Sequence, residues 1–301
     1  MKRKYPLRHY IRGIAGEIVA HPANRAHPYR AVARGLRWQV RKRVVRKPFD
    51  IDYRGMVLRC YPDSGSASNV FYFTSRYDYH EMGFLDRYLR PGDGFLDIGA
   101  NIGTYSLYAA SRTGRAARID AFEPLPRAAD RARENFALNG LTNAEVHRVA
   151  VGSKPGTADF LDFDVSSSVD HDTRRKGDLL QVDVARIADL VEGRSYAFAK
   201  VDVEGVELEA LRGAEPLIER CDPPVWMIEV FEHQLEKHAT SARILDDWMH
   251  DHGFTAAWYD ADTRELSYPT DAWTLHANLI YIADSRRAEV EARLRDGALP
   301  G

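Results

Sequence analysis

Phe95-Leu-Asp-Ile-Gly-Ala-Asn-Ile-Gly-Thr-Tyr-Ser106 is the stretch of sequence that decides the fold. Its short apolar run Phe95–Ile98 follows the turn-forming segment Pro91-Gly-Asp-Gly94, and this combination predicts a buried strand entered through a turn. Gly99 and Gly103 then bracket a tight loop, and the residues after the loop predict a helix. Strand, glycine loop and helix form the first unit of a doubly wound α/β domain, in which ligands bind at the carboxyl ends of the strands.

The polar residues of this loop indicate which kind of ligand it holds. Asp97 stands at the end of the predicted strand, and Asn101 stands between the two glycines. A pyrophosphate is bound by backbone N–H groups at a helix N-terminus, so a carboxylate directed at it would repel it. A carboxylate suits a ligand with a cationic amine, such as the methionine end of S-adenosyl-L-methionine. We therefore predict S-adenosylmethionine as the cofactor, with Gly99 and Gly103 allowing close approach of the backbone.

An acidic residue also ends the next predicted strand. Ala117–Phe122 is apolar and leads into Glu123-Pro124, and Glu123 follows Asp97 by 26 residues, which is enough for one helix and a return strand. A carboxylate at this position can accept hydrogen bonds from both ribose hydroxyls of an adenosine. A nicotinamide-dependent dehydrogenase places an acid here as well. That alternative stays open on Glu123 alone and is disfavoured by Asp97.

A second charged stretch is Lys200-Val-Asp-Val-Glu-Gly205, at the end of the predicted fourth core strand. Lys200, Asp202 and Glu204 occupy alternate positions where apolar residues would serve a strand that only packs. We expect this tip to face the transferable group of the cofactor. In the purely structural alternative, Asp202 and Glu204 are acids favoured at a helix N-terminus, and Lys200 pairs with one of them.

A general base assists methyl transfer when the acceptor is an alcohol. The candidate catalytic residues are Asp202, Glu229, Lys200 and His233, the last two being a charged neighbour and a histidine just past the fifth strand. A lone histidine after a strand is more often a surface residue than a base. A divalent metal held by Asp202, Glu204 and Glu229 is an alternative, because hard cations prefer carboxylate oxygens. The same carboxylates also work without a metal, and no metal is assigned.

The combination of motifs resembles the FkbM family of S-adenosylmethionine-dependent methyltransferases over about residues 80–283. The matching segments are Asp97–Ser106, Phe122–Pro126, Asn135, Asn139-Gly140, Lys200–Glu207, Leu211–Ala214 and Ile228-Glu229. The resemblance implies a class I methyltransferase fold and, as the usual reaction, O-methylation of a hydroxyl on a sugar, glycan or natural product. The residues that it assigns to the cofactor are Asp97, Gly99, Asn101, Gly103, Ser106, Glu123 and Pro124. Asp222-Pro-Pro-Val225 looks like an amino-methyltransferase motif, but it precedes the fifth strand and predicts a turn.

The composition of the chain indicates the cellular compartment in which we expect the protein. The chain has 301 residues, of which 45% are hydrophobic and 29% charged, as in soluble globular proteins. No apolar run approaches the ~20 residues of a membrane span, and the segment after Met1-Lys-Arg-Lys4 is short and contains Glu17, unlike an export signal. Cys60 and Cys221 have no metal-type spacing. We therefore expect a cytoplasmic protein.

The small net charge of −2 hides a strong asymmetry. Residues 1–50 carry 14 Lys and Arg against two acidic residues, a net of +12, and residues 51–301 carry a net of −14. The basic part predicts a helix with one apolar stripe at four-residue spacing, formed by Val32, Leu36, Val40 and Val44. Three interpretations stay open: peripheral contact with a membrane, an electrostatic footprint for nucleic acid in a nucleic-acid methyltransferase, and packing on the acidic domain or on a second subunit of a homo-oligomer.

The expected organisation has four parts. A basic helical arm spans 1–47, and an accessory region with a hairpin and a helix spans 48–90. The methyltransferase domain spans 91–284, and a charged helix or tail spans 285–301. The fold class is α/β, a doubly wound Rossmann-like sheet, mostly parallel with a final antiparallel strand. Within these parts the sequence also predicts a hairpin at Arg54-Gly55, a loop at 63–68, one strand at 145–151, one helix at 206–219 and a polar insert at 166–177.

Overall fold

The computed structural model describes residues 7–162, 178–275 and 277–297. The chain divides into two compact units. Of the described residues, the first comprises those up to Ile51 and Arg59–Tyr79, and the second comprises Asp52–Leu58, His80–Asp162 and those from 178 onward. The predicted polar insert at 166–177 lies outside the described residues.

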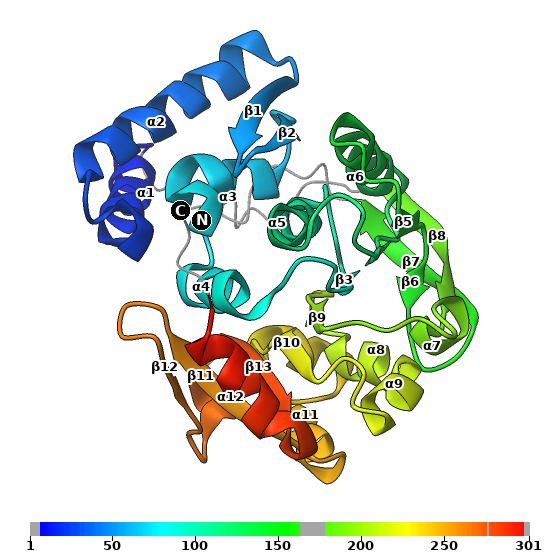
Figure 1. The fold of residues 1–301 in the computed structure, drawn as a ribbon. Coiled ribbons are helices and arrows are strands. Elements are labelled where there is room, and N and C mark those ends of the chain that lie inside the picture. The colour runs from blue at the N-terminus through cyan, green and yellow to red at the C-terminus, as the bar shows by residue number, and fades with distance from the viewer. Residues whose placement is uncertain (1–6, 163–177, 276, 298–301) are drawn as a thin grey trace, which may run out of the picture. The chain divides into compact units, whose positions relative to one another are not determined.

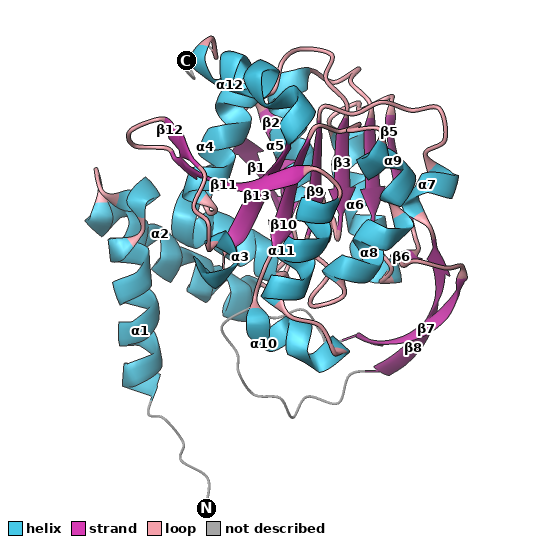
Figure 2. Cartoon of the chain, turned by 90° about the horizontal axis from the view of Figure 1, so that it is seen from below, coloured by secondary structure: helices cyan, strands magenta, loops and turns pink. Residues whose placement is uncertain are grey.

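An eight-stranded sheet forms the centre of the second unit, with the order β12-β11-β13-β10-β9-β3-β4-β5 (Figures 1 and 2). In chain order its strands are β3 (Phe95–Ile98), β4 (Ile119–Phe122), β5 (Ala144–His147), β9 (Phe198–Val201), β10 (Val225–Glu229), β11 (Phe254–Asp260), β12 (Glu265–Ser267) and β13 (Asn278–Ala283). Strands β10, β9, β3, β4 and β5 run parallel, and β13 is antiparallel to both of its neighbours. The predicted doubly wound sheet with a final antiparallel strand is confirmed.

Helices cover both faces of this sheet. Helices α5 (Thr104–Thr113) and α6 (Pro126–Leu138) lie on one face, and α8 (Glu207–Gly213), α9 (Glu215–Glu219) and α11 (Ala242–Asp251) lie on the other (Figure 2). The other α-helices among the described residues of this unit are α4 (Tyr79–Tyr88), α7 (Ile187–Leu190), α10 (Glu232–Leu235) and α12 (Arg287–Arg295). Strands covered on both faces carry continuous apolar runs. Every residue of β3, β4 and β9 is accordingly buried.

Two predicted elements are each divided in the structure. The run 145–151 serves two sheets, since β5 pairs with β4, whereas β6 (Ala150–Val151) pairs with β8 (Asp178–Ala185). Strand β8 also pairs antiparallel with β7 (Gly156–Asp162). The predicted helix 206–219 breaks between α8 and α9, because the proline at position 216 starts the second helix and cannot donate the hydrogen bond that would continue the first.

Helices dominate the first unit. They are α1 (Leu7–Ala20), α2 (Pro28–Val40), a π-helical turn η2 (Arg41–Val45) and α3 (Gly65–Phe73), with short 3₁₀ turns at Pro22–Asn24 and Thr74–Arg76. The predicted loop at 63–68 is wrong, because α3 begins at Gly65. Ser64 accepts a hydrogen bond from the Ala67 N–H at 3.2 Å and caps that helix. A serine- and glycine-rich run therefore marks a helix start here, rather than a loop.

The hairpin predicted at Arg54-Gly55 is confirmed: β1 (Phe49–Tyr53) and β2 (Met56–Cys60) form a two-stranded sheet around it. The other 3₁₀ turns among the described residues are Glu236–His238, Ala272–Leu275 and Asp284–Arg286. Within the described ranges, no helix combines the length and the apolar character needed to cross a bilayer.

Candidate functional site

Acidic side chains gather at the carboxyl ends of four neighbouring strands. Asp97 is the second-last residue of β3, Glu123 follows β4, Asp202 follows β9 and Glu229 ends β10. The strands are parallel and in register, with Asp97 opposite Lys200 on β9. The carboxyl edge at the centre of the sheet is where doubly wound folds bind their ligands. The sheet therefore brings together the residues that the sequence separates by more than a hundred positions.

Asp97 is completely buried, and its two oxygens differ. Oδ2 accepts a hydrogen bond from Ser106 Oγ at 2.6 Å, whereas Oδ1 is buried without a hydrogen-bond partner among the described residues. Burial raises the pKa of Asp97, and the positive charge of Lys200 and the bond from Ser106 work against that rise. A buried carboxylate oxygen without a hydrogen-bond partner lowers the stability of the folded protein. It is a strong acceptor for a cationic donor brought by a ligand.

The loop after β3 depends on glycine for its path. Gly99 has a φ of +85°, and a Cβ at this position would lie 1.8 Å from the carbonyl oxygen of Asp202. Asn101 and Gly103 also have positive φ values, of 51° and 81°. This backbone conformation directs the Asn101 N–H toward Glu123, where it donates to Oε2 at 2.9 Å. The loop thus connects the ends of β3, β4 and β9 through backbone contacts that side chains would block.

Glu123 is buried at the tip of β4. Besides the bond from Asn101, its Oε1 accepts the Leu125 N–H at 3.0 Å, across the half-buried Pro124. Burial raises the pKa of Glu123 to about 7, although the two backbone bonds oppose the rise. Each carboxylate oxygen retains a second lone pair. The carboxylate is therefore fixed in orientation and can still accept two hydroxyl donors.

Lys200 and Asp202 form an ion pair at the end of β9. Their side chains share one side of the strand because they are two residues apart. Lys200 Nζ donates to Asp202 Oδ2 at 2.8 Å and lies 4.8 Å from the centre of the Tyr105 ring. Burial opposes the charged form of Lys200, but the charges of Asp202 and Asp97 outweigh it and raise the pKa of the lysine. The lysine therefore stays a cation at neutral pH.

Three glutamates extend this acidic cluster. Glu229 Oε2 and Glu207 Oε2 are buried without hydrogen-bond partners among the described residues. Burial, followed by the negative charges of Asp202 and Glu204, raises the pKa of Glu229 far above its ordinary value. Glu204 is exposed and accepts a hydrogen bond from Gln234 Nε2 at 2.7 Å. Burial and the neighbouring carboxylates therefore favour the protonated form of Glu229, which can donate a hydrogen bond.

The predicted site residues are not equally close to the centre. His233 is exposed on α10, with its ring 5.9 Å from that of Phe231, and the described part of the chain offers it no hydrogen bond that would orient it as a base. Glu207 and Tyr105 belong to the cluster although the sequence pattern does not single them out. An acid in the first turn of a helix and an aromatic residue in a buried helix are both common. Only the fold shows that they face Asp202 and Lys200.

A group of side chains with metal-type spacing occurs elsewhere in the second unit. Over residues 7–162, 178–275 and 277–297, this spacing is met by Asp120, Glu145 and His147, and not by Asp202, Glu204 and Glu229. Asp120 already accepts hydrogen bonds from five donor atoms, which are Arg118 Nε and Nη2, Arg194 Nη1, His147 Nε2 and Tyr196 Oη. The guanidinium groups of Arg118 and Arg194 therefore already supply the positive charge that a metal ion would bring. The metal alternative at Asp202 stays a prediction.

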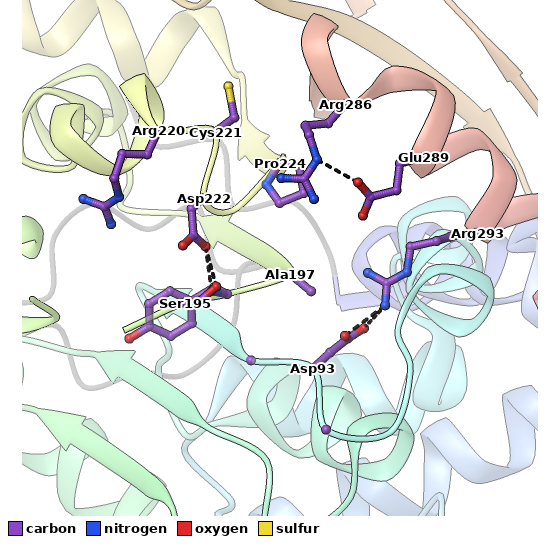
Figure 3. A pocket seen from close by; sticks show the side chains of 13 residues that line it. Asp93, Ser195, Ala197, Arg220, Cys221, Asp222, Pro224, Arg286, Glu289 and Arg293 are labelled. Carbon is purple, nitrogen blue, oxygen red and sulfur yellow. Dashed lines mark hydrogen bonds and ion pairs between the residues drawn. The ribbon is translucent and has the colours of Figure 1, made fainter. Parts of the chain in front are cut away.

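A hollow of about 570 Å³ opens at the other edge of the sheet, where the strands begin (Figure 3). Four of its charged side chains form two pairs: Arg293 donates to both oxygens of Asp93 at 2.7 and 2.9 Å, and Arg286 donates to Glu289 at 2.7 Å. The segment Asp222-Pro-Pro224 lines the same hollow as a bend before β10, which confirms the predicted turn. The hollow is therefore remote from the acidic cluster.

Comparison with known proteins gives a family match over the same region. Residues 97–256, more than half of the chain, match the methyltransferase FkbM domain. "Methyltransferase 1" of Beauveria bassiana is 27% identical over 44% of this chain and 66% of its own length. "Methyltransferase sdnD" of Sordaria araneosa is 29% identical over 42% of this chain and 62% of its own length. The chain thus covers less than two thirds of either relative.

Among solved structures, the crystal structure of methyltransferase FkbM from Methylobacillus flagellatus covers 84% of this chain with 18% identity and a TM-score of 0.42. The match covers 59% of that protein. A structure of a SAM-dependent methyltransferase from Aquifex aeolicus covers 69% of this chain and 90% of its own, with 15% identity and a TM-score of 0.40. Scores of this size describe a distant likeness, and the assignment of the chain does not rest on them.

Proposed function

The chain belongs to the FkbM methyltransferase family, and from this premise we propose that it is an S-adenosylmethionine-dependent O-methyltransferase. The observation that carries the proposal is the completely buried Asp97, whose Oδ1 has no hydrogen-bond partner among the described residues. A buried carboxylate oxygen requires a donor, and a ligand ammonium supplies one with full opposite charge. The amine of S-adenosylmethionine meets that requirement.

The rest of the carboxyl edge suits the other parts of the same cofactor. The loop Gly99–Gly103 has no side chain at Gly99, where its backbone passes against Asp202, nor at Gly103, where it passes against Phe136 of α6. Glu123 is held by two backbone N–H groups in an orientation that leaves lone pairs for two ribose hydroxyls. Ser106 fixes the rotamer of Asp97. These are the residues that would hold the cofactor, which supplies an electrophilic methyl group on a sulfonium.

Asp202 is our choice for the residue that receives the proton of the acceptor hydroxyl. Asp202 follows β9, which pairs with β3, the strand that carries Asp97. About a third of the Asp202 side chain is exposed, so an acceptor can reach it. Lys200 holds one carboxylate oxygen and leaves the other for the acceptor. Glu229, whose pKa is raised by burial and by Asp202, is placed to orient the acceptor oxygen through a hydrogen bond. Positioning of this kind supplies much of the rate of an in-line displacement.

The acceptor class follows from the family and not from the geometry. FkbM-type enzymes act on hydroxyls of sugars, glycans and natural products, and a carboxylate base such as Asp202 fits an alcohol acceptor. The strongly acidic second unit makes a polyanionic acceptor unfavourable, which argues against nucleic acid as the substrate of this site.

A transfer assay tests the proposal. The protein is incubated with S-adenosylmethionine carrying a deuterated methyl group and with separate pools of glycans, hydroxylated natural products, amines and RNA, and products are identified by mass spectrometry. We expect the label in a base-stable ether of a hydroxylated acceptor. Label found in an amine or in RNA would replace O-methylation, and failure to bind S-adenosylhomocysteine would remove the methyltransferase assignment altogether.

A further inference from the structure

Helix α2 of the first unit has one apolar face that is fully packed. Ala31, Gly35 and Trp38 are buried. The Trp38 ring stacks on Phe71 of α3 with ring centres 4.5 Å apart, and its Nε1 donates to Ser68 Oγ at 3.1 Å. A Cβ on Gly35 would lie 3.0 Å from Ile18 Cδ1, so the glycine allows α1 close to α2. The core of this unit therefore uses one face of α2.

The opposite face of the same helix is also apolar, and it is exposed. It is formed by Tyr29, Leu36, Val40 and Val44, which are 89%, 55%, 61% and 74% exposed and which we call the α2 stripe. Spacings of seven, four and four residues place all four on one side of the helix and its π-helical continuation. The sequence-based stripe shares three of these residues. Within the described residues, the stripe is therefore not part of a core.

Basic residues border the α2 stripe. The exposed ones between positions 28 and 47 are Arg30, Arg37, Arg41, Arg43, Arg46 and Lys47. From Ile18 to Phe49 the sequence contains no Asp or Glu. Arg34, by contrast, points inward and donates to Phe71 O at 2.6 Å and to Asn24 Oδ1 at 2.9 Å. The outer side of α2 is thus apolar at its centre and only positive around it.

We propose that the α2 stripe and its basic border bind the surface of an anionic lipid bilayer, with α2 lying in the plane of the headgroups. An apolar stripe inserts among the acyl chains, and the surrounding Arg and Lys meet the lipid phosphates and carboxylates. The helix is too short and too basic to span the membrane. All of the residues of the α2 stripe and its basic border belong to the first unit, whereas the proposed methyl-transfer site belongs to the second.

Two other occupants fit the same surface less well. A second copy of the chain would bring a second set of six cations against the first, and like charges at an apolar contact oppose association. Nucleic acid would use the cations but would leave Leu36, Val40 and Val44 exposed, because phosphates offer no apolar surface to cover them. Only a bilayer of anionic lipid offers both kinds of surface.

Vesicle sedimentation with the full-length chain tests the inference. The vesicles consist of phosphatidylcholine alone or with about 30% phosphatidylserine, since surface charge drives the electrostatic part. The stripe variant carries Leu36→Ser, Val40→Ser and Val44→Ser, and the charge variant carries Arg37→Gln, Arg43→Gln and Lys47→Gln. The control carries Ile244→Ser and Leu275→Ser, which alter two comparably exposed apolar residues of the second unit. Thermal melts establish that each variant is folded.

We expect the unmodified protein and the control to sediment with the anionic vesicles and not with the neutral ones. The bound fraction should fall at least tenfold in the stripe variant and in the charge variant. No sedimentation of the unmodified protein, or equal sedimentation of the stripe variant, would overturn the inference. So would light scattering that showed a dimer dissociated by the stripe substitutions, or RNA binding lost only in the charge variant without vesicle binding.

Discussion

The ammonium of Lys200 donates a hydrogen bond to Oδ2 of Asp202 over 2.8 Å, and the lysine is almost completely buried. The same charge also acts on Asp97, which lies opposite Lys200 in the register of β3 and β9. A single cation therefore stabilises the two carboxylates to which we assign the cofactor amine and the acceptor proton. The effects of substituting Lys200, Asp202 and Asp97 can therefore be predicted separately.

Asp202→Asn keeps the shape of the side chain and removes its basic oxygen. We expect turnover to fall by about 10²–10⁴-fold, the usual contribution of a general base, with little change in S-adenosylhomocysteine affinity. Turnover is measured as single-turnover methyl transfer to the acceptor found by the screen. The affinity for S-adenosylhomocysteine is measured by calorimetry. Repeating the assay with EDTA and then with magnesium shows whether the carboxylate also holds a metal. Near-normal turnover would contradict the assignment and make Glu229 the next residue to test.

Lys200→Met removes the buried cation while keeping much of the apolar stem. Breaking a fully buried ion pair costs about 3–5 kcal/mol, because the partner charge is left without compensation. A third of the Asp202 side chain is exposed to solvent, which lowers this cost. We expect the free energy of unfolding at pH 7.5 to fall by less than that amount, and adding Asp202→Asn to restore part of the loss. Denaturant titrations of the two single variants and the double variant measure the coupling. Strictly additive effects would show that the pair is not energetically coupled.

Glu123 gives the cofactor affinity a pH dependence. Its pKa of about 7 in the free protein means that it is largely protonated below neutral pH. Ribose hydroxyls donate to the carboxylate, so binding favours the charged form, and affinity should rise as pH increases from 6 to 8. Calorimetry across this range should show several-fold tightening for the unmodified protein and a flatter profile for Glu123→Gln. The same slope in both proteins would assign the effect to another group.

Glu229 should make the protein less stable as pH rises. Its pKa is raised in the folded state, so the folded protein keeps a proton that the unfolded chain has released. The stabilisation is complete below the ordinary glutamate pKa and is lost as pH increases toward the folded value. Glu229→Gln should therefore raise Tm by about 3 °C or more at pH 9 and change it little at pH 5. The exposed Glu192→Gln is the control, and a pH-independent shift would contradict this account.

The sequence was most informative where local pattern and function coincide. The run around Asp97 and the acid at Glu123 predicted two adjacent strand ends, because turn glycines and buried apolar runs are local signals. Asn135 was included through family resemblance alone. The structure gives the reason, since its side chain donates to the Ile102 carbonyl at 2.9 Å and fixes the loop before α5. A long-range contact of this kind has no local signature.

Features that depend on tertiary context were less accessible. The run 145–151 contains no glycine or proline that would mark a break, yet its partners divide it between two sheets. Glu207 looks like an ordinary first-turn acid, and its buried Oε2 becomes visible only when α8 is placed beside β9. The stripe on α2 was predicted, but a period of 3.6 residues cannot tell a packed face from an exposed one. The buried residues Trp38 and Gly35 lie on the opposite face of α2 and pack into the core of the first unit.

Calorimetry of adenosyl ligands with Asp97→Asn tests the central claim most directly. S-adenosylhomocysteine carries the amine that Asp97 Oδ1 is proposed to bind, whereas methylthioadenosine lacks it. A charge-assisted hydrogen bond is worth about 1.5–3 kcal/mol, so we expect S-adenosylhomocysteine to bind at least tenfold more weakly to Asp97→Asn. Methylthioadenosine should bind the variant and the unmodified protein equally, and the exposed Asp130→Asn should change neither affinity. Unchanged S-adenosylhomocysteine affinity in a folded Asp97→Asn protein would contradict the account.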